Sequence, residues 1–218
     1  MGDRGMNELL KWSIENSETP SSSTSTNPTG DHPPGRSINA EALNSLLGGP
    51  SDADLMKASM AAITSSNVSL ADKLVAFDNF EQLVEQVDNA NDIENLGLWP
   101  SLAALLSNEE ADLRRYACWC IGTAVQNNVK CQERPKALGI IPQLINVAIN
   151  DSEEQVRRKA IYAISSEVRN YQPGLDEAVQ ALPKGIVPEG GVDAANMDAV
   201  DQIMQKLRDE SAKKALAR

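Results

Sequence analysis

The sequence has few of the residues on which metal sites and nucleophilic catalysis depend. Its 218 residues include one histidine, His32, which excludes multi-histidine metal sites and most histidine-based catalysis. It has no GxxxxGK(S/T) phosphate-binding motif, and the Gly-rich string LLGGPS lies between two helical patterns, where a turn explains it. These absences favour a binding protein over an enzyme, and no metal ion or cofactor is expected.

Basic residues and long apolar runs are also scarce. The formal net charge of −11 argues against nucleic acid and against an anionic membrane surface as partners. No run approaches the roughly 18 apolar residues of a membrane span, and the start, MGDRGMNELLKWSIENS, lacks the apolar stretch of a secretory signal. Cys118, Cys120 and Cys131 are expected as reduced, small apolar side chains, which fits a cytoplasmic location.

Aromatic residues make up only 4% of the chain, whereas apolar residues make up 41%. The core must therefore consist mostly of Leu, Ile, Val and Ala, a composition that favours packed helices over a β-sandwich. No stretch shows the period-two alternation of a strand. An all-α fold is expected.

Composition divides the chain into four segments. Residues 1–17 contain a short amphipathic helix pattern, and residues 18–37 are a linker rich in Ser, Thr, Pro and Gly. The first segment is thus tethered, and either acts separately or docks back on the body. Residues 38–182 carry continuous helical patterns, including a helix over 70–88 capped by Ser69, and residues 183–218 form a linker and a last helix.

A repeat is the strongest pattern in the sequence. DLRRYACWCIGTAVQNN recurs as EQVRRKAIYAISSEVRNY at an offset of 43, which aligns Arg114 with Arg157. LGLWPSLAALL and LGIIPQLINVA precede these two copies, and FEQLVEQVDNA is an earlier copy. About three units of roughly forty residues predict an armadillo/HEAT-like right-handed solenoid with helical caps and a flexible N-terminal segment. The arginines following the acidic clusters NEEAD and DSEEQ could pair with those carboxylates.

Asparagines and a polar stripe recur with the repeat. Asn89, Asn127 and Asn170 are expected to close three long helices, either as caps alone or as caps that also line a binding surface. A second set of positions shares one face of each long helix. Its members are Glu81, Glu85 and Asp88, then Trp119, Thr123 and Gln126, then Tyr162, Ser166 and Arg169. Trp119 is either an anchor for a partner or a side chain half-buried between helices.

Several long strings resemble one known family. NELLKWSIENS, GGPSDADLMKASM, LVAFDNFEQLVEQVDNANDIENLGLW, IGTAVQNNVKCQE and RRKAIYAISSEVRNYQP are similar to the cytosolic armadillo-type nucleotide exchange factors of heat-shock protein 70 chaperones, in their fungal form. An animal chaperone-binding protein is homologous to that form. The resemblance covers about residues 6–17 and 38–182.

The resemblance implies a function and a partner. The concave face of the solenoid would grip one lobe of the chaperone's ATPase domain, speed ADP release and so let client protein go, without covalent chemistry. The chain would act as a monomer. In this family the N-terminal segment has been linked to client release, which here would involve Leu9, Leu10, Trp12 and Ile14.

The resemblance and the repeat together give a partner-binding set. Its members are Asp88, Asn89, Ala90, Asn91, Asp92, Trp119, Thr123, Gln126, Asn127, Asn128, Tyr162, Arg169 and Asn170. Ala90, small within a polar run, is expected to allow close approach by the partner. The substitution Ala90→Arg is therefore expected to abolish chaperone binding without changing helical content.

The resemblance ends after Leu182, where the family pattern continues into a further unit. Here prolines and the Gly190-Gly191 pair interrupt the pattern. Val200, Ile203, Met204 and Leu207 then mark one last amphipathic helix, interpreted as a terminal cap. The resemblance therefore does not extend to the contacts that the family makes through its last unit.

Three other functions compete with this interpretation. One is an armadillo scaffold for extended peptides, such as a nuclear-import adaptor, although such proteins use long ladders of Trp and Asn and this stripe has only Trp119. Another is an enzyme with a carboxylate-only site. The third is an interaction module without exchange activity, because the shortened C-terminus could bind a chaperone lobe without opening it.

Overall fold

A computed structural model describes residues 50–188 and 190–216. The segments expected at 1–17 and 18–37, and the first residues of the segment expected from 38, lie outside this range. The described residues form ten helices and no strand, so the all-α expectation is confirmed for them. The helices are α3 (Asp52–Thr64), α4 (Leu70–Val84), α5 (Val87–Asn95), α6 (Trp99–Leu105), α7 (Ala111–Val125), α8 (Val129–Ala137), α9 (Ile140–Asn150), α10 (Glu154–Val168), α11 (Gln172–Ala181) and α12 (Met197–Leu216).

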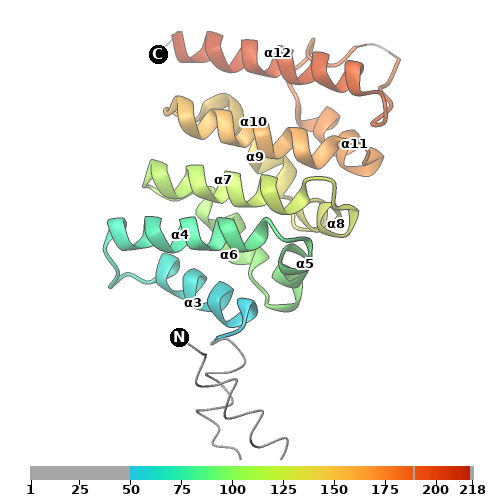
Figure 1. Cartoon of the computed structure of the whole chain (residues 1–218). Coiled ribbons are helices and arrows are strands. Elements are labelled where there is room, and N and C mark those ends of the chain that lie inside the picture. Colours follow the sequence, from blue (N-terminus) through green and yellow to red (C-terminus); the bar gives the residue numbers. More distant parts are fainter. Residues whose placement is uncertain (1–49, 189, 217–218) are drawn as a thin grey trace, which may run out of the picture. The chain divides into compact units, whose positions relative to one another are not determined.

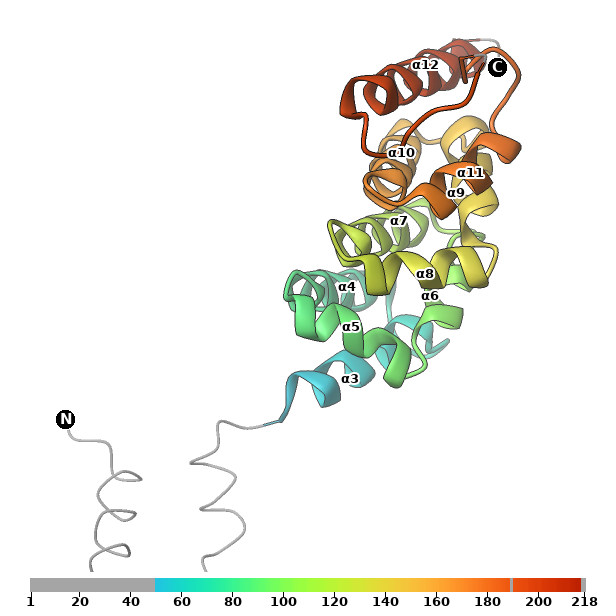
Figure 2. The same cartoon turned by 90° about the vertical axis from the view of Figure 1, so that its right-hand side faces the viewer.

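Three long helices, α4, α7 and α10, lie side by side in one row (Figure 1). Their contacts show that α4 and α7 run in the same direction, because Phe77 stacks on Tyr116 and Glu81, one turn later, bonds Thr123. Figure 2 shows α5, α8 and α11 stacked beside this row, each directly following one of the long helices in sequence.

The core of the row consists of small and branched apolar side chains, as the composition predicts. In α7 and α10 the buried positions recur at the repeat offset: Ala117 and Ala160, Ile121 and Ile164, Val125 and Val168 are each at most 1% exposed. The two helices also approach closely. A Cβ built on Gly122 of α7 would lie 2.6 Å from Cε1 of Tyr162 in α10. Any larger residue at position 122 would therefore force the Tyr162 ring or the Ala163 backbone to move.

Two of the three predicted asparagines lie where a long helix ends. Asn127 and Asn170 have φ angles of 53° and 55°, the left-handed conformation that ends a helix, directly after α7 and α10. The prediction for Asn89 is wrong, because α4 ends at Val84 rather than at 88 and Asn89 lies inside α5. Its side-chain amide instead donates to the Leu83 carbonyl in the last turn of α4, at 3.0 Å.

Ser69 begins α4 as predicted, and its hydroxyl accepts a hydrogen bond from the Asp72 backbone N–H at 3.2 Å. The three cysteines are buried free thiols. Across residues 50–188 and 190–216, none of the helices is both long enough and apolar enough to cross a bilayer.

The last helix, α12, packs on α10 with an apolar face. Val200, Ile203, Met204 and Leu207, the side chains expected on that face, are all 0% exposed. The helix runs opposite to α10, because Arg157 near the start of α10 bonds Ser211 near the end of α12, at 3.1 Å. α12 therefore covers the last apolar surface of the row without continuing its direction.

Candidate functional site

Five of the predicted site residues line one shallow pocket of about 370 Å³ across α4, α7 and α10. They are Trp119, Thr123, Gln126, Asn127 and Tyr162, and the pocket is completed by Glu81 and Glu85. We call this region the α4–α7–α10 surface. It forms because residues at repeat positions point to the same side of parallel neighbouring helices.

An aromatic stack crosses the buried edge of this surface. The Tyr116 ring stacks on Phe77 of α4 and on Trp119, with ring centroids 5.4 Å and 5.7 Å apart. The Lys159 ammonium of α10 lies 3.3 Å from the Trp119 ring centroid, a cation–π contact. Burial lowers the pKa of Lys159, while the nearby Glu81 carboxylate acts in the opposite sense. Trp119 is thus held from both sides and keeps part of its surface exposed.

Hydrogen bonds between neighbouring helices fix the polar part of the surface. The Thr123 hydroxyl donates to Oε1 of Glu81 at 3.0 Å, and the Tyr162 hydroxyl donates to Oε1 of Gln126 at 3.0 Å. Glu81 is only 5% exposed, and this burial raises its pKa despite the Thr123 hydrogen bond. The surface is therefore preorganised, because each of these polar side chains is already positioned by a neighbouring helix.

The Asp88–Asp92 segment lies in α5, and its members point in different directions. Asp88 is exposed and Asn91 and Asp92 are partly exposed, whereas Asn89 and Ala90 are 8% and 2% exposed. The Asn89 amide also donates to Oδ2 of Asp52 in α3, at 2.8 Å. Asn89 therefore ties α5 to α3 and α4.

The expectation that Ala90 offers surface to a partner is wrong. Its side chain is buried, and its carbonyl accepts a hydrogen bond from the Cys131 thiol of α8 at 3.3 Å. An arginine here would force α5 away from α8. The substitution Ala90→Arg would disturb the fold, so loss of binding in that variant would not locate the site.

Asn128 and Asn170 have different surroundings. Asn128, 9% exposed, caps α8 by accepting from the Cys131 N–H, and donates to Oδ1 of Asn91 in α5 at 3.2 Å. Asn170 is exposed, and its backbone N–H donates to the Ala194 carbonyl at 3.0 Å. The buried Asn128 joins two helices, whereas the side chain of Asn170 remains accessible.

The Arg169 side chain contacts other residues of the same chain. Its Nε donates to the Ser165 hydroxyl at 3.0 Å, and its guanidinium contacts the Met197 sulfur and forms an ion pair with Asp201 of α12. These contacts hold the end of α10 against the start of α12. Arg169 does not line the pocket that Trp119, Thr123 and Tyr162 line.

Two lining carboxylates and one cation were missing from the predicted set. Glu81 and Glu85 occupy stripe positions of the first unit, so the repeat alignment contained the signal for them. Lys159 aligns with Tyr116 at the offset of 43 and precedes the stripe by one turn. A wider stripe, with one more position per helix, would have included it.

The remaining predictions have simple outcomes. Leu9, Leu10, Trp12 and Ile14 lie outside the described residues. Among the residues that are described, no group of three or more His, Cys, Asp or Glu side chains is arranged to hold a metal ion.

Comparison with known proteins identifies the family. Residues 6–93 match the family described as nucleotide exchange factor Fes1, and residues 89–180 match the SIL1/FES1/HPBP1 C-terminal domain. A Gibberella zeae protein named Hsp70 nucleotide exchange factor FES1 is 53% identical over 98% of this chain and 100% of its own length. The Coccidioides immitis protein of that name is 48% identical, over 95% of this chain and 98% of its own. The Saccharomyces cerevisiae protein is 43% identical, over 77% of this chain and 57% of its own. The chain belongs to the Fes1 family of nucleotide exchange factors.

Proposed function

We propose that this chain binds the ATPase domain of an Hsp70 chaperone as a monomer in the cytoplasm and accelerates ADP release. The observation that carries the proposal is the 53% identity, over 98% of this chain, with a protein named Hsp70 nucleotide exchange factor FES1. Exchange of this kind needs a binding surface and no catalytic residue. The shallow pocket across α4, α7 and α10 supports the proposal as a candidate for that surface.

The mechanism is a coupling between two binding equilibria. A factor that binds the ADP-free ATPase domain more tightly than the ADP-bound one must weaken ADP binding to the same extent. A preference of about 1.4 kcal/mol corresponds to a tenfold change in nucleotide affinity. A preorganised surface can supply this preference, because little ordering cost is incurred when the partner binds.

The finer architecture belongs to the same proposal. We infer a right-handed armadillo-like solenoid of about three units, with α12 as its terminal cap. Recurrent structural roles support this: Asn127 and Asn170 adopt the same left-handed turn, and α4, α7 and α10 lie in one row (Figure 1). The inner side of the row would then be the concave face.

The proposed contact set combines Glu85, which the predicted set lacked, with predicted residues that are accessible on or beside the α4–α7–α10 surface. Glu85, Gln126 and Asn127 are exposed, and Trp119 and Tyr162 are partly exposed beside them. Asp88 is exposed on α5 and can contribute at the edge. The apolar side chains of residues 9–14 would assist client release as a separate activity of the N-terminal segment.

The activity is tested by stopped-flow release of a fluorescent ADP analogue from a cytosolic Hsp70, with and without the full chain. Acceleration that grows with the concentration of the chain and saturates supports the proposal. Binding without acceleration would instead support an interaction module that lacks exchange activity, and would refute the exchange function.

The site is tested by a matched pair of charge reversals in the full chain. Glu85→Arg changes an exposed residue of the α4–α7–α10 surface, whereas Glu109→Arg makes the same change in the exposed loop before α7. We expect Glu85→Arg to weaken Hsp70 binding by about tenfold or more, which is typical of a like-charge or lost contact within an interface. Equal affinities for the two variants would remove the surface from the site.

A further inference from the structure

Arg114 joins two successive units through a complete set of hydrogen bonds. Its Nη1 donates to the carbonyls of Asn108 and Glu109, both at 2.8 Å, in the loop before its own helix. Its Nε and Nη2 donate to the two carboxylate oxygens of Asp151, at 2.6 Å and 3.0 Å, in the loop before α10. This bidentate pair is the strongest form of arginine–carboxylate contact.

Arg157, the repeat equivalent of Arg114, makes the same loop contacts but lacks the carboxylate contact. Its Nη1 donates to the carbonyls of Asp151 and Ser152 at 2.9 Å, which reproduces the loop contacts of Arg114. Its Nε donates to the Ser211 hydroxyl of α12, where Arg114 has a carboxylate. Within residues 50–188 and 190–216, no hydrogen bond involves its Nη2 and no ion pair involves Arg157.

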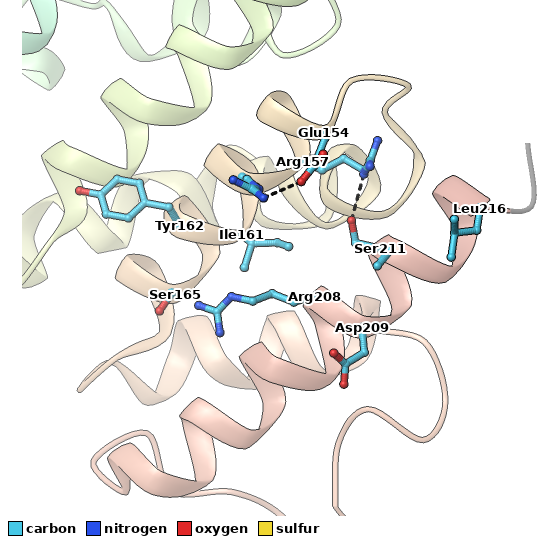
Figure 3. A pocket seen from close by; sticks show the side chains of 11 residues that line it. Glu154, Arg157, Ile161, Tyr162, Ser165, Arg208, Asp209, Ser211 and Leu216 are labelled. Atoms are coloured by element: carbon cyan, nitrogen blue, oxygen red, sulfur yellow. Dashed lines mark hydrogen bonds and ion pairs between the residues drawn. The ribbon is translucent and has the colours of Figure 1, made fainter.

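A cavity of about 760 Å³ opens between α10 and α12 beside this guanidinium. Figure 3 shows Arg157 reaching from α10 to Ser211 of α12, with Ile161 and Arg208 along the same cavity. Arg157 and Ser211 are 6% and 5% exposed, so the position is a buried one at the base of the cavity. Its walls are partly apolar, since Ile161 and Leu216 line it.

The charges around the cavity favour an anionic ligand. Three arginines line it, Arg157, Arg158 and Arg208, against two carboxylates. Both carboxylates already have partners: Glu154 pairs with Arg158 at 2.6 Å, and Asp209 accepts from the Gln205 amide at 3.0 Å. The charge of Arg157 helps to lower the pKa of Asp151, but the Asp151 carboxylate forms its ion pair with Arg114. Arg157 therefore remains available to a carboxylate from outside, and so does the exposed Arg208, which donates only to the neutral Gln205 side-chain oxygen at 3.5 Å.

We propose that this cavity binds an acidic segment of a partner protein, with one carboxylate beside Arg157 in the position that Asp151 takes beside Arg114. The ligand carboxylate accepts from Nη2 of Arg157 and from the Ser211 hydroxyl, and Arg208 balances a second acidic group. An apolar side chain next to the carboxylate packs on Ile161 and Leu216. This site is separate from the α4–α7–α10 surface and does not depend on the proposed exchange activity.

The test uses fluorescence anisotropy with a labelled, end-blocked peptide Asp-Glu-Leu-Glu-Asp and its neutral counterpart Asn-Gln-Leu-Gln-Asn. The full chain is expected to bind the acidic peptide, more weakly at high salt, and not the neutral one. No binding of the acidic peptide, or equal binding of both, would overturn the proposal.

The decisive variants are Ser211→Asp and its neutral isostere Ser211→Asn. Asp at 211 supplies in cis the carboxylate that Arg157 lacks, so peptide affinity should fall by about tenfold and the melting temperature should rise. Ser211→Asn should change neither the peptide affinity nor the melting temperature. Equal loss of affinity in both variants would show that the cavity rather than the charge matters, and would refute the carboxylate site.

A second pair of variants tests the cavity edge without touching buried residues. Arg208→Gln should weaken peptide binding several-fold, whereas Arg134→Gln, on α8 and away from the cavity, should leave it unchanged. If neither Arg208→Gln nor Ser211→Asp changed the affinity for the acidic peptide, the peptide would bind elsewhere and the proposed site would be refuted.

Discussion

Helix α10 packs against α7 on one side and against α12 on the other, and the two junctions differ in direction and in side chains. Towards α7 the helices are parallel, and the contact uses repeat positions: Gly122, Tyr162 and the Lys159–Trp119 pair. Towards α12 the helices are antiparallel, and the contact is an apolar seam with Arg157 and Arg169 at its ends.

The difference teaches how a repeat row is used and how it is closed. The repeated junction aligns equivalent residues, so it leaves the polar and aromatic α4–α7–α10 surface that we propose as the binding site. The closing junction does not follow the repeat, so Arg157 meets a serine where Arg114 meets a carboxylate. The Gibberella zeae relative is covered along its full length by this chain, whereas 57% of the Saccharomyces cerevisiae relative is covered. Relatives of both lengths carry the same name.

The largest loss of stability is expected when an apolar side chain between α12 and α10 is shortened. Ile203 is 0% exposed, so Ile203→Ala should lower the free energy of unfolding by about 3 kcal/mol through lost burial and a cavity. The neighbouring Gln202 is exposed, and Gln202→Ala should change stability by no more than about 0.5 kcal/mol. Urea denaturation of both variants measures the difference, and equal stability would mean that α12 is not an integral part of the fold.

The parallel junction can be weakened at its ion pair. Burial by itself raises the pKa of Asp151, but the hydrogen bonds from Arg114 and from the Glu153 backbone outweigh it, so the pKa is lowered overall. Asp151→Asn should therefore cost about 2 kcal/mol at pH 7.

This loss should depend on pH with a definite sign. A lowered pKa stabilises the fold above the unfolded-state value of 3.8 and loses that effect as the pH falls through the folded-state value. The gap between wild type and Asp151→Asn should thus narrow in acid. A gap that is constant from neutral pH to strong acid would contradict the assignment.

The close approach of α7 to α10 predicts an unusual response to alanine. Gly→Ala in an open helix position stabilises by up to about 1 kcal/mol. At Gly122 the new Cβ would meet the Tyr162 ring and the Ala163 backbone, so Gly122→Ala should destabilise by about 1.5 kcal/mol. A thermal melt measures this, and combining it with Tyr162→Ala should recover part of the loss. Stabilisation by Gly122→Ala alone would disprove the tight junction.

A pH-dependent effect is expected at Glu167, which faces neither junction. The side chain is 0% exposed, neither carboxylate oxygen has a hydrogen-bond partner among the described residues, and burial, aided by Glu177, raises its pKa to about 9. The folded chain keeps this proton up to about pH 9, whereas the unfolded chain loses it near 4.5. The stabilising effect of the proton is therefore complete below 4.5 and lost as pH rises through 9.

Glu167→Gln removes this titration. The variant should be more stable than wild type at pH 8, the difference should narrow as the pH falls, and the two should converge in mild acid. Chemical denaturation at both pH values measures the difference. Wild type and variant losing stability in parallel as the pH rises would show that Glu167 is ionised in the folded chain.

Periodicity and repeat offset predicted what depends on equivalent positions. They placed the buried stripe of α7 and α10, the left-handed Asn127 and Asn170, and the five residues that share the α4–α7–α10 pocket. All of these follow from one helix geometry repeated at a constant spacing.

What failed depends on contacts between units, which a one-dimensional pattern does not contain. Ala90 looked accessible because its neighbours are polar, but α8 covers it through Cys131. The arginines were expected to pair with the acidic clusters preceding their own helices. Arg115 does so with Asp112, whereas Arg114 reaches forward to Asp151 in the next unit.

The measurement that tests the central claim most directly is site-specific photo-crosslinking to the Hsp70 ATPase domain during ADP release. A photoreactive amino acid is placed at Gln126, exposed on the α4–α7–α10 surface, and in a second variant at Asn146, exposed on α9. The account predicts crosslinking to the ATPase domain from position 126 and none from position 146. Crosslinking from 146 without crosslinking from 126 would contradict it.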